Sequence, residues 1–407
     1  MSIIYLDHAA TTPLDPRVLE AMSPYLQFEY GNPSSFHTLG KQAKDALEQA
    51  RRSVARVFGS RPEEIIFTSG GTEANNLAIL GAARAHLASG RHLITTTVEH
   101  HSVLGSFEHL AKKEGFEVTK IGVDKYGRVS VSEIMAALRP DTMLVSVMFA
   151  NNEIGTIQPI AKIGNQLRKY REEPARKNNS RSAPYPLFHS DACQAAGALE
   201  LNVQKNHLDL LTINAAKIYG PKGSGALFVR SGVKLEPLIH GGFQERGLRP
   251  GTENVAAIIG LARALEISEE SRQTESKRLI ELRDQLINGI KAKIPKTRLN
   301  GHPRERLPNN VNISILDVEG EAMILYLDAA GIEASTGSAC TSLALDPSHV
   351  ILATGLPYEA AHGSLRFTLG RATTTVNIER VLEILPPLVE KLRALSPLKL
   401  SERYLEV

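Results

Sequence analysis

The stretch EIIFTSGGTEANN, residues 64–76, sets the pattern from which the fold of this chain can be read. Its first half, EIIFTS, is apolar and β-branched, which is typical of a buried strand. Gly70 and Gly71 end that run, and we predict a helix from there through about Ala88. A strand that turns through glycines into a helix exposes backbone N–H groups at the helix N-terminus, where a phosphate binds readily. Taken alone, the turn is weak support for a phosphate site, because most such turns only end a strand.

The alternation of short apolar runs with longer helical patterns continues along the chain. Asp15-Pro16 is typical of a helix start, and an apolar stripe from Leu39 to Val57 indicates a second helix. Helices are also predicted at 102–113 and 131–138. Strands are predicted at 93–97, 117–123 and 142–149, and in LFHSDA (187–192), LDLLTI (208–213) and SGALFVR (224–230). This spacing predicts an α/β fold with a mainly parallel sheet that helices cover on both faces.

A second, smaller domain is predicted after Asn254–Ala292, which has the pattern of one long helix. The elements expected in that domain are strands at 310–316 and 364–369, helices at 319–330 and 377–395, and a loop near Cys340. We therefore expect an N-terminal segment over residues 1–14 that joins the small domain or the rim of the active site. A large domain over 15–255 and a small domain over 256–407 follow. The polar stretch Tyr170–Pro186 has no apolar period, and we interpret it as an exposed loop insertion.

Composition excludes several classes of protein. The 407 residues include 47 Lys and Arg against 44 Asp and Glu, so the net charge is 47 − 44 = +3, and 42% of residues are hydrophobic. That balance is ordinary for a globular enzyme and disfavours both disorder and direct nucleic-acid binding. The longest apolar runs, 143–150 and 255–262, fall well short of the roughly 18 residues of a membrane helix. The two cysteines, Cys193 and Cys340, are too few for a disulfide framework. We also expect no signal peptide, and both features favour a location in the cytoplasm.

Two charged residues follow predicted buried strands. Lys217 comes after LDLLTI within NAAKIYGPKGSGAL (214–227), and a partly desolvated lysine at a sheet edge is a candidate to form a Schiff base. Asp191 ends a strand 26 residues earlier. A carboxylate there either caps the next turn or pairs with a protonated pyridine nitrogen, and the residues alone leave both interpretations open.

In this order, these elements resemble the fold-type I pyridoxal-phosphate enzymes, and specifically the cysteine desulfurases of the branch that feeds iron–sulfur cluster assembly. The resemblance extends over almost the whole chain. The motifs that carry it are YLDHAATTP (5–13), GNPSSFH (31–37), SGGTEANN (69–76), VEHHSV (98–103), ANNEIGTIQP (150–159), HSDACQ (189–194), KIYGPKG (217–223), GFQERGLRPGTEN (242–254), STGSACTS (335–342), DPSHV (346–350) and SLRFTLGR (364–371). It implies a large domain with a seven-stranded, mainly parallel sheet and a smaller α/β domain.

The resemblance also implies which residues bind pyridoxal 5′-phosphate. Lys217 would hold the cofactor covalently and then move the substrate Cα proton. His100 would stack on the pyridine ring and could exchange protons with the substrate, while Asp191 would keep the pyridine nitrogen protonated. The remaining cofactor contacts are Gly71, Thr72 and Asn214 at the phosphate, Gln194 and Asn152 near the ring hydroxyl, and Thr252, which would reach a phosphate across the interface of a homodimer. No metal site is predicted.

Substrate binding and sulfur transfer are implied by three further residues. Arg366 would clamp the carboxylate of L-cysteine, with Asn32 nearby. Cys340 lies in a small, polar stretch that does not build a core, and as a thiolate it would take sulfur from L-cysteine, leaving L-alanine and a Cys340 persulfide. The persulfide would pass to an acceptor protein, either a scaffold for iron–sulfur clusters or a carrier for tRNA thiolation. Cys193 is interpreted as structural.

Two alternatives stay open, and departures from the family pattern motivate the first of them. Where the family has Ser-x-His-Lys, this chain has Asn214-Ala215-Ala216-Lys217, so one side-chain donor to the phosphate is missing. Where the family has three glycines in a row, this chain has Gly241-Gly242-Phe243. A degenerate, non-catalytic paralogue that binds a scaffold is therefore one alternative. The other is a lyase that prefers selenocysteine.

Overall fold

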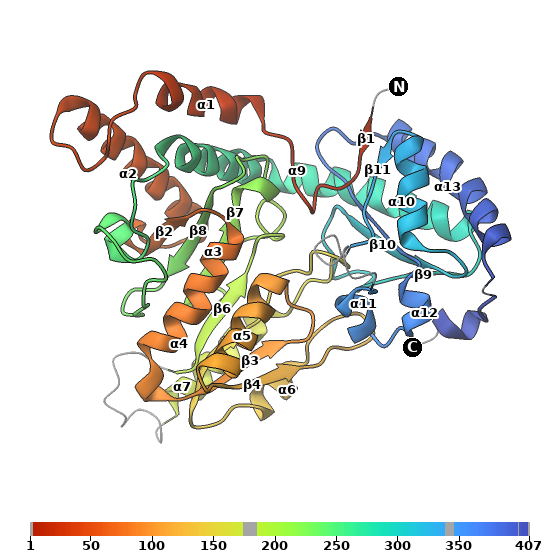
Figure 1. The fold of residues 1–407 in the computed structure, drawn as a ribbon, viewed down its shortest axis with the longest axis horizontal. Helices are drawn as coiled ribbons and strands as arrows, with labels where there is room; N and C mark the ends of the chain where they lie inside the picture. The colour runs from red at the N-terminus through yellow and green to blue at the C-terminus, as the bar shows by residue number, and fades with distance from the viewer. Residues whose placement is uncertain (1–2, 174–184, 338–345, 398, 406–407) are drawn as a thin grey trace.

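A computed structural model of the chain describes residues 3–173, 185–337, 346–397 and 399–405 (Figure 1). Its centre is a seven-stranded sheet, and a smaller group of strands and helices lies beside it. Across the large sheet, the strand order is β2 (Ile65–Thr68), β8 (Gly225–Val229), β7 (Leu210–Asn214), β6 (Leu187–Asp191), β5 (Thr142–Ser146), β3 (His92–Thr96) and β4 (Glu117–Ile121). Only β8 runs against its neighbours, so the prediction of a mainly parallel sheet is confirmed.

Helices cover both faces of this sheet. Successive side chains along a strand point to opposite faces, and each face has its own apolar cluster. Ile65 and Phe67 belong to one cluster and Ile66 to the other. The first cluster includes side chains of α1 (Pro16–Gln27), α2 (Thr38–Phe58), α6 (Val131–Ala136) and α7 (Ile160–Glu172). The second includes side chains of α3 (Gly71–Asn76), α4 (Ala82–Ala85) and α5 (His101–Lys113). The predicted N-cap is confirmed, since the Asp15 carboxylate accepts a hydrogen bond from the Arg17 backbone N–H.

The smaller unit contains a three-stranded antiparallel sheet and a two-stranded parallel one. In the first, β10 (Asn310–Ile315) lies between β9 (Thr297–Leu299) and β12 (Ser364–Thr368). In the second, β1 (Ile4–Tyr5) pairs with β11 (Ile332–Glu333), which brings the N-terminal segment to this unit. Its helices are α10 (Gly320–Ala329), α11 (His349–Ala353), α12 (Tyr358–Ala361) and α13 (Thr375–Leu395). Short 3₁₀ turns in the chain are Pro62–Glu64, Leu87–Ser89, Ala215–Lys217, Gln244–Gly247 and Glu402–Leu405.

One helix, α9 (Val255–Lys293), runs from the large sheet to the smaller unit (Figure 1). Its first part, up to Ile267, packs in the core of the large sheet, and its last part, from Leu279, packs in the core of the smaller unit. No residue from 269 to 278 is buried. The division at residue 255 stays a prediction, and we propose that the two domains are better divided within α9.

Local differences from the predicted elements have physical reasons. The helix expected from Gly70 to Ala88 is interrupted by a π-helical turn at Leu77–Gly81. The predicted loop at 170–186 is too wide, because α7, which we did not predict, continues to Glu172 and Tyr185 packs against the core. Arg171 also donates a hydrogen bond to the Pro186 carbonyl and pairs with Asp209 at 2.6 Å. Among the described residues, no helix is long and apolar enough to cross a membrane.

Candidate active site

A cavity of about 350 Å³ lies where β5, β6 and β7 end, between the large sheet and the smaller unit. The carboxyl ends of parallel strands are the usual place for a ligand in an open α/β sheet. Most of the predicted site residues line this cavity together, namely Gly71, Thr72, His100, Asn152, Asp191, Gln194, Asn214, Lys217 and Arg366.

Lys217 lies in the 3₁₀ turn that follows β7 directly. The Asn214 amide oxygen caps this turn by accepting a hydrogen bond from the Ala216 backbone N–H at 3.1 Å. The Lys217 ammonium donates to the carbonyl of Ala10, in the N-terminal segment. The end of a buried strand thus brings a lysine and an amide to the same wall of the cavity.

Asp191 is the last residue of β6, and both of its carboxylate oxygens are engaged. One accepts from the Cys193 backbone N–H at 2.9 Å and the other from the Asn75 side-chain amide at 2.7 Å. Asp191 therefore caps the turn after its strand and also lines the cavity. The two interpretations left open by the sequence are compatible with each other.

The turn from β2 into α3 needs its glycines. Gly70 has a φ of 150°, which L-residues with a side chain rarely adopt. A Cβ on Gly71 would lie 2.7 Å from the Cys193 sulfur, and a Cβ on Gly225 would lie 2.7 Å from the Gly70 Cα. These close approaches bring the first turn of the helix, with Thr72, against the end of β7. Its backbone N–H groups and the Asn214 amide are available to an anion in the cavity.

Cys193 is free, and burial raises its pKa well above the ordinary value for a thiol. A thiol in that environment stays protonated at neutral pH, because desolvation disfavours the thiolate. Its contact with Gly71 and its bond to Asp191 are packing and capping roles. These observations support the interpretation of Cys193 as structural.

His100 is the N-cap of α5 and lines the cavity beside Asp191. Its Nδ1 accepts a hydrogen bond from the Ser102 backbone N–H at 3.1 Å. Burial is the main cause that lowers the pKa of this imidazole, while the charge of Asp191 acts in the opposite direction. His101 also lines the cavity and faces His349, with 4.9 Å between the ring centroids.

Arg366 reaches the cavity from β12 of the smaller unit and is 3% exposed. Its guanidinium forms an ion pair with Asp7 at 2.7 Å and donates to the Asn152 carbonyl at 3.1 Å. The cation is thus held at the cavity by groups from the N-terminal segment and from the large domain. Such a planar fork matches a carboxylate in shape and charge.

Sequence reasoning missed Glu153, a fully buried carboxyl group that lines the cavity. Burial raises the pKa of Glu153 to about 7, and the Ser348 hydroxyl donates to this carboxyl group. The backbone carbonyl of Glu153 accepts hydrogen bonds from Asn310 and Asn312 of β10. The residue lies inside the motif ANNEIGTIQP, so the motif was noticed while its buried acid was not.

Two predicted residues, Asn32 and Thr252, are not brought into this cavity. Asn32 is exposed and its side-chain oxygen accepts from the Ser34 backbone N–H at 2.9 Å. Thr252 is exposed and does not line the cavity. Cys340 lies outside the described residues, and Gly337 is the last described residue before it.

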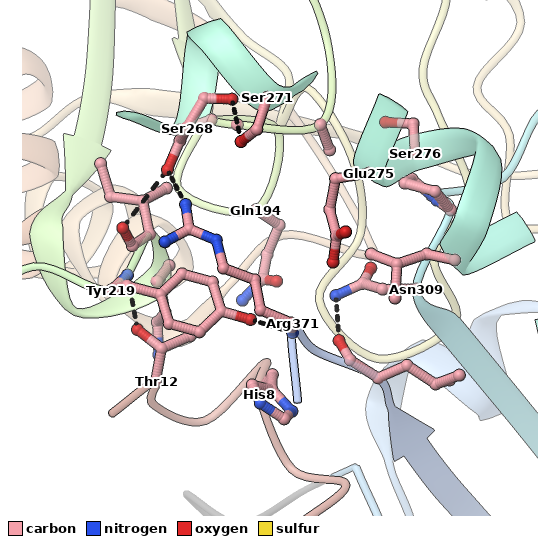
Figure 2. A pocket seen from close by; sticks show the side chains of 18 residues that line it. His8, Thr12, Gln194, Tyr219, Ser268, Ser271, Glu275, Ser276, Asn309 and Arg371 are labelled. Atoms are coloured by element: carbon pink, nitrogen blue, oxygen red, sulfur yellow. Dashed lines mark hydrogen bonds between the residues drawn. The ribbon is translucent and has the colours of Figure 1, made fainter. Parts of the chain in front are cut away.

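Figure 2 shows a second, smaller cavity of about 70 Å³, which shares Gln194 and Lys217 with the first. Several of the residues that line it contact one another. Arg371 stacks on the Tyr219 ring at 4.1 Å and donates to the Ser268 hydroxyl at 3.0 Å, and the Tyr219 backbone N–H donates to Thr12. At about 70 Å³, this cavity is far smaller than the roughly 300–1,000 Å³ of small-molecule sites.

Comparisons with known proteins agree with this geometry. The model of the aminotransferase class-V family matches residues 4–381. The cysteine desulfurase IscS of Methanosarcina thermophila is 50% identical over 98% of this chain and 95% of its own length, and that of Dictyoglomus turgidum is 48% identical over 97% of each chain. Among solved structures, a NifS-like protein has a TM-score of 0.86 and 35% identity over 96% of this chain and 100% of its own. The chain therefore belongs to the aminotransferase class-V family and, within it, to the cysteine desulfurases.

Proposed function

We propose that this chain removes sulfur from L-cysteine with the help of pyridoxal 5′-phosphate, giving L-alanine and a persulfide on Cys340. The observation that carries the proposal is the convergence of Lys217, Asp191, His100 and Arg366 on one cavity. The names of relatives that are 48–50% identical over nearly the whole chain support the same activity.

The residues of the cavity fit the cofactor that the family implies. Its volume of about 350 Å³ is within the range of roughly 300–1,000 Å³ for small-molecule sites. The chain supplies backbone donors at Gly71 and Thr72 and the Asn214 amide for a phosphate, Asp191 for a protonated ring nitrogen, and Lys217 for a carbonyl carbon. When bound, the cofactor supplies an electron sink for the charge that develops at the substrate Cα.

Substrate binding and proton transfer are assigned to side chains of the protein. Arg366 binds the substrate carboxylate and orients L-cysteine, and Lys217 takes the Cα proton. Another solved relative, SspA, is 35% identical over 90% of this chain, and its structure in complex with cysteine supports cysteine as the ligand.

Sulfur transfer is assigned to Cys340. Its thiolate attacks the substrate sulfur, an S–S bond forms, and the Cβ–S bond breaks with its electron pair left on carbon, which takes up a proton. The overall exchange balances as L-cysteine plus the Cys340 thiol giving L-alanine plus the Cys340 persulfide. Cys193 is unsuited to this step because its buried thiol stays protonated.

We further propose that the chain acts as a homodimer in the cytoplasm. Phe36 and Phe243 are 92% and 94% exposed, and large aromatic side chains left in water often mark an interface. Thr252 lies nine residues beyond Phe243 and is exposed as well, which suits a contact with the partner's phosphate. A sulfur-acceptor protein, a scaffold for iron–sulfur clusters or a carrier for tRNA thiolation, would then receive the persulfide sulfur.

Release of alanine from L-cysteine, with a thiol reductant present, tests the proposal. The wild type and Cys193→Ser should both release alanine, whereas Cys340→Ser should retain the bound cofactor and lose at least about 99% of the rate, since a hydroxyl is a far poorer nucleophile. A purified protein that binds the cofactor but releases no alanine would instead support the non-catalytic paralogue. Equal loss in both variants would overturn the assignment of Cys340.

A further inference from the structure

A chain of hydrogen bonds behind the cavity connects Asp191 with His100. The Asn75 side-chain amide donates to the Asp191 carboxylate at 2.7 Å and to the Ser102 hydroxyl at 2.9 Å. The Ser102 hydroxyl in turn lies 2.8 Å from His100 Nδ1. Asn75 is on α3 and Ser102 is on α5, two helices that pack against each other on the same face of the large sheet (Figure 1).

The direction of each bond follows from groups that have only one role. An ionised carboxylate only accepts, so the Asn75 group that faces Asp191 is the NH₂. Its second hydrogen goes to the Ser102 oxygen, which leaves the single Ser102 hydroxyl hydrogen for His100. The Ser102 backbone N–H, which can only donate, also points at Nδ1 from 3.1 Å. Nδ1 of His100 is therefore an acceptor and carries no hydrogen, and a neutral ring must hold its proton on Nε2.

We propose that Asn75 and Ser102 are positioning residues that hold His100 neutral with its proton on Nε2, so that the imidazole offers a hydrogen-bond donor rather than a base to the cavity. Among the described residues, Nε2 has no hydrogen-bond partner, and His100 lines the cavity. This inference deepens the proposed function and rests on it for the identity of the group that His100 faces.

The surroundings of His100 support an uncharged ring. Burial lowers its pKa, and so do the positive charge of Lys217 and the neighbouring imidazoles of His101 and His349. The negative charge of Asp191 acts in the opposite direction and raises this pKa. Asn75 donates to the same Asp191 carboxylate, and an amide donor stabilises that negative charge without adding a cation beside His100.

The consequence for the reaction is a division of tasks. A ring whose Nε2 already carries a hydrogen has no lone pair there to receive a proton, and its Nδ1 lone pair is directed at Ser102. The Cα proton therefore goes to Lys217, while His100 donates a hydrogen bond and supplies a flat, uncharged surface. This also explains why the pair of residues after His100 in the motif includes a serine whose hydroxyl points inward.

The tautomer can be measured directly on the holoenzyme with ¹⁵N-labelled histidine. Comparison with His100→Gln identifies the resonances of His100 among the 13 histidines. We expect Nδ1 to show the shift of an unprotonated, hydrogen-bonded nitrogen and Nε2 that of a protonated one from pH 6 to 8. A proton on Nδ1, or a charged ring at pH 7, would overturn the proposal.

Variants at Ser102 test the role of the hydroxyl. Loss of one donor to Nδ1 in Ser102→Ala should raise the titration midpoint of His100, and with it the acid limb of kcat/KM, by roughly half to one pH unit. Ser102→Thr should restore both, because it keeps a hydroxyl. Ser106→Ala is the matched control, since the buried Ser106 hydroxyl bonds the Ser102 carbonyl at 2.8 Å and does not reach the ring.

An unchanged titration in Ser102→Ala, or an equal shift in Ser106→Ala, would refute the role of Ser102. Alanine release by the wild type is scored separately. A wild type that shows the expected tautomer and releases no alanine would refute the proposed function alone, whereas an active enzyme with the opposite tautomer would refute this inference alone.

Discussion

The two walls of the cavity are built in different ways. On the large-domain wall, each of three side chains accepts a hydrogen bond from the backbone N–H two residues later, as Asp191, Asn214 and His100 all do. On the small-domain wall, Arg366 is held by Asp7, 359 residues away, and by Asn152, 214 residues away. The first wall is fixed by the ends of strands and helices, whereas the second depends on three distant segments meeting.

Because of this difference, the two walls suit different tasks: one holds the cofactor and the other binds the substrate. Local caps need no rearrangement when a ligand enters, which suits groups that hold a cofactor permanently. An arginine that is paired with Asp7 must exchange that partner, or share it, when a substrate carboxylate arrives. The small-domain wall is thus the one where binding and release of substrate are expected to be adjusted.

Removing the lysine of the large-domain wall should have the largest effect. Lys217→Ala loses the group that is proposed both to hold the cofactor and to take the Cα proton, so alanine release should fall by at least about a thousandfold. Lys222→Ala is the control, because Lys222 lies on the same segment and is exposed. Activity within tenfold of the wild type in Lys217→Ala would show that this wall does not perform the chemistry.

Freeing Arg366 should act on substrate affinity. In Asp7→Asn, the guanidinium no longer shares its charge with an internal carboxylate, so the KM for L-cysteine should fall several-fold. The melting temperature should fall too, since a nearly buried cation loses its partner at a cost of about 2–5 kcal/mol. Asp141→Asn, which breaks a surface pair with Arg139, should change neither value appreciably. A higher KM in Asp7→Asn would mean that Asp7 orients Arg366 rather than competing with the substrate.

The free energy of unfolding should depend on pH through Glu153, which lies at the boundary between the two walls. Its pKa is raised from 4.5 to about 7 in the folded protein, so between these values the folded state holds a proton that the unfolded state has released. The free energy of unfolding should therefore fall as pH rises from 5 to 7. Glu153→Gln should remove about 2 kcal/mol of that fall.

Chemical denaturation at several pH values measures this difference. The matched control is Glu172→Gln, because Glu172 is exposed and pairs with Arg168 on the surface. If Glu153→Gln and the wild type lose stability equally between pH 5 and 7, then Glu153 is ionised throughout and the buried carboxyl group has another source of stabilisation.

The large-domain wall could be predicted well from the sequence because its determinants are local. Strand ends, the Gly70-Gly71 turn and the lysine after LDLLTI are all visible as short patterns, and they converge in the cavity. The partners that complete the site are not local. Nothing near Arg366 in the sequence points to Asp7, and nothing near Asp191 points to Asn75, because both contacts depend on tertiary packing.

Errors in the predicted elements have the same origin. Two-residue strands such as β1 and β11 carry no periodic signal, and they form only because they pair with each other. Helix α7 was missed and the loop after it drawn too wide, since Arg171 and Tyr185 look polar or isolated in sequence yet are fixed by Asp209 and by the core.

Because helix α9 packs in both cores, a movement of one wall of the cavity is coupled to the position of the other. At about 1.5 Å per residue, its 39 residues form a rod of about 58 Å with one end clamped in each core. A rod clamped in this way acts as a lever arm, so a rotation of only about one degree at the large-domain end displaces the far end by about 1 Å. Small adjustments in the packing beneath α9 would thus shift the core of the smaller unit, which carries Arg366, on the ångström scale that separates a carboxylate within hydrogen-bonding reach from one outside it.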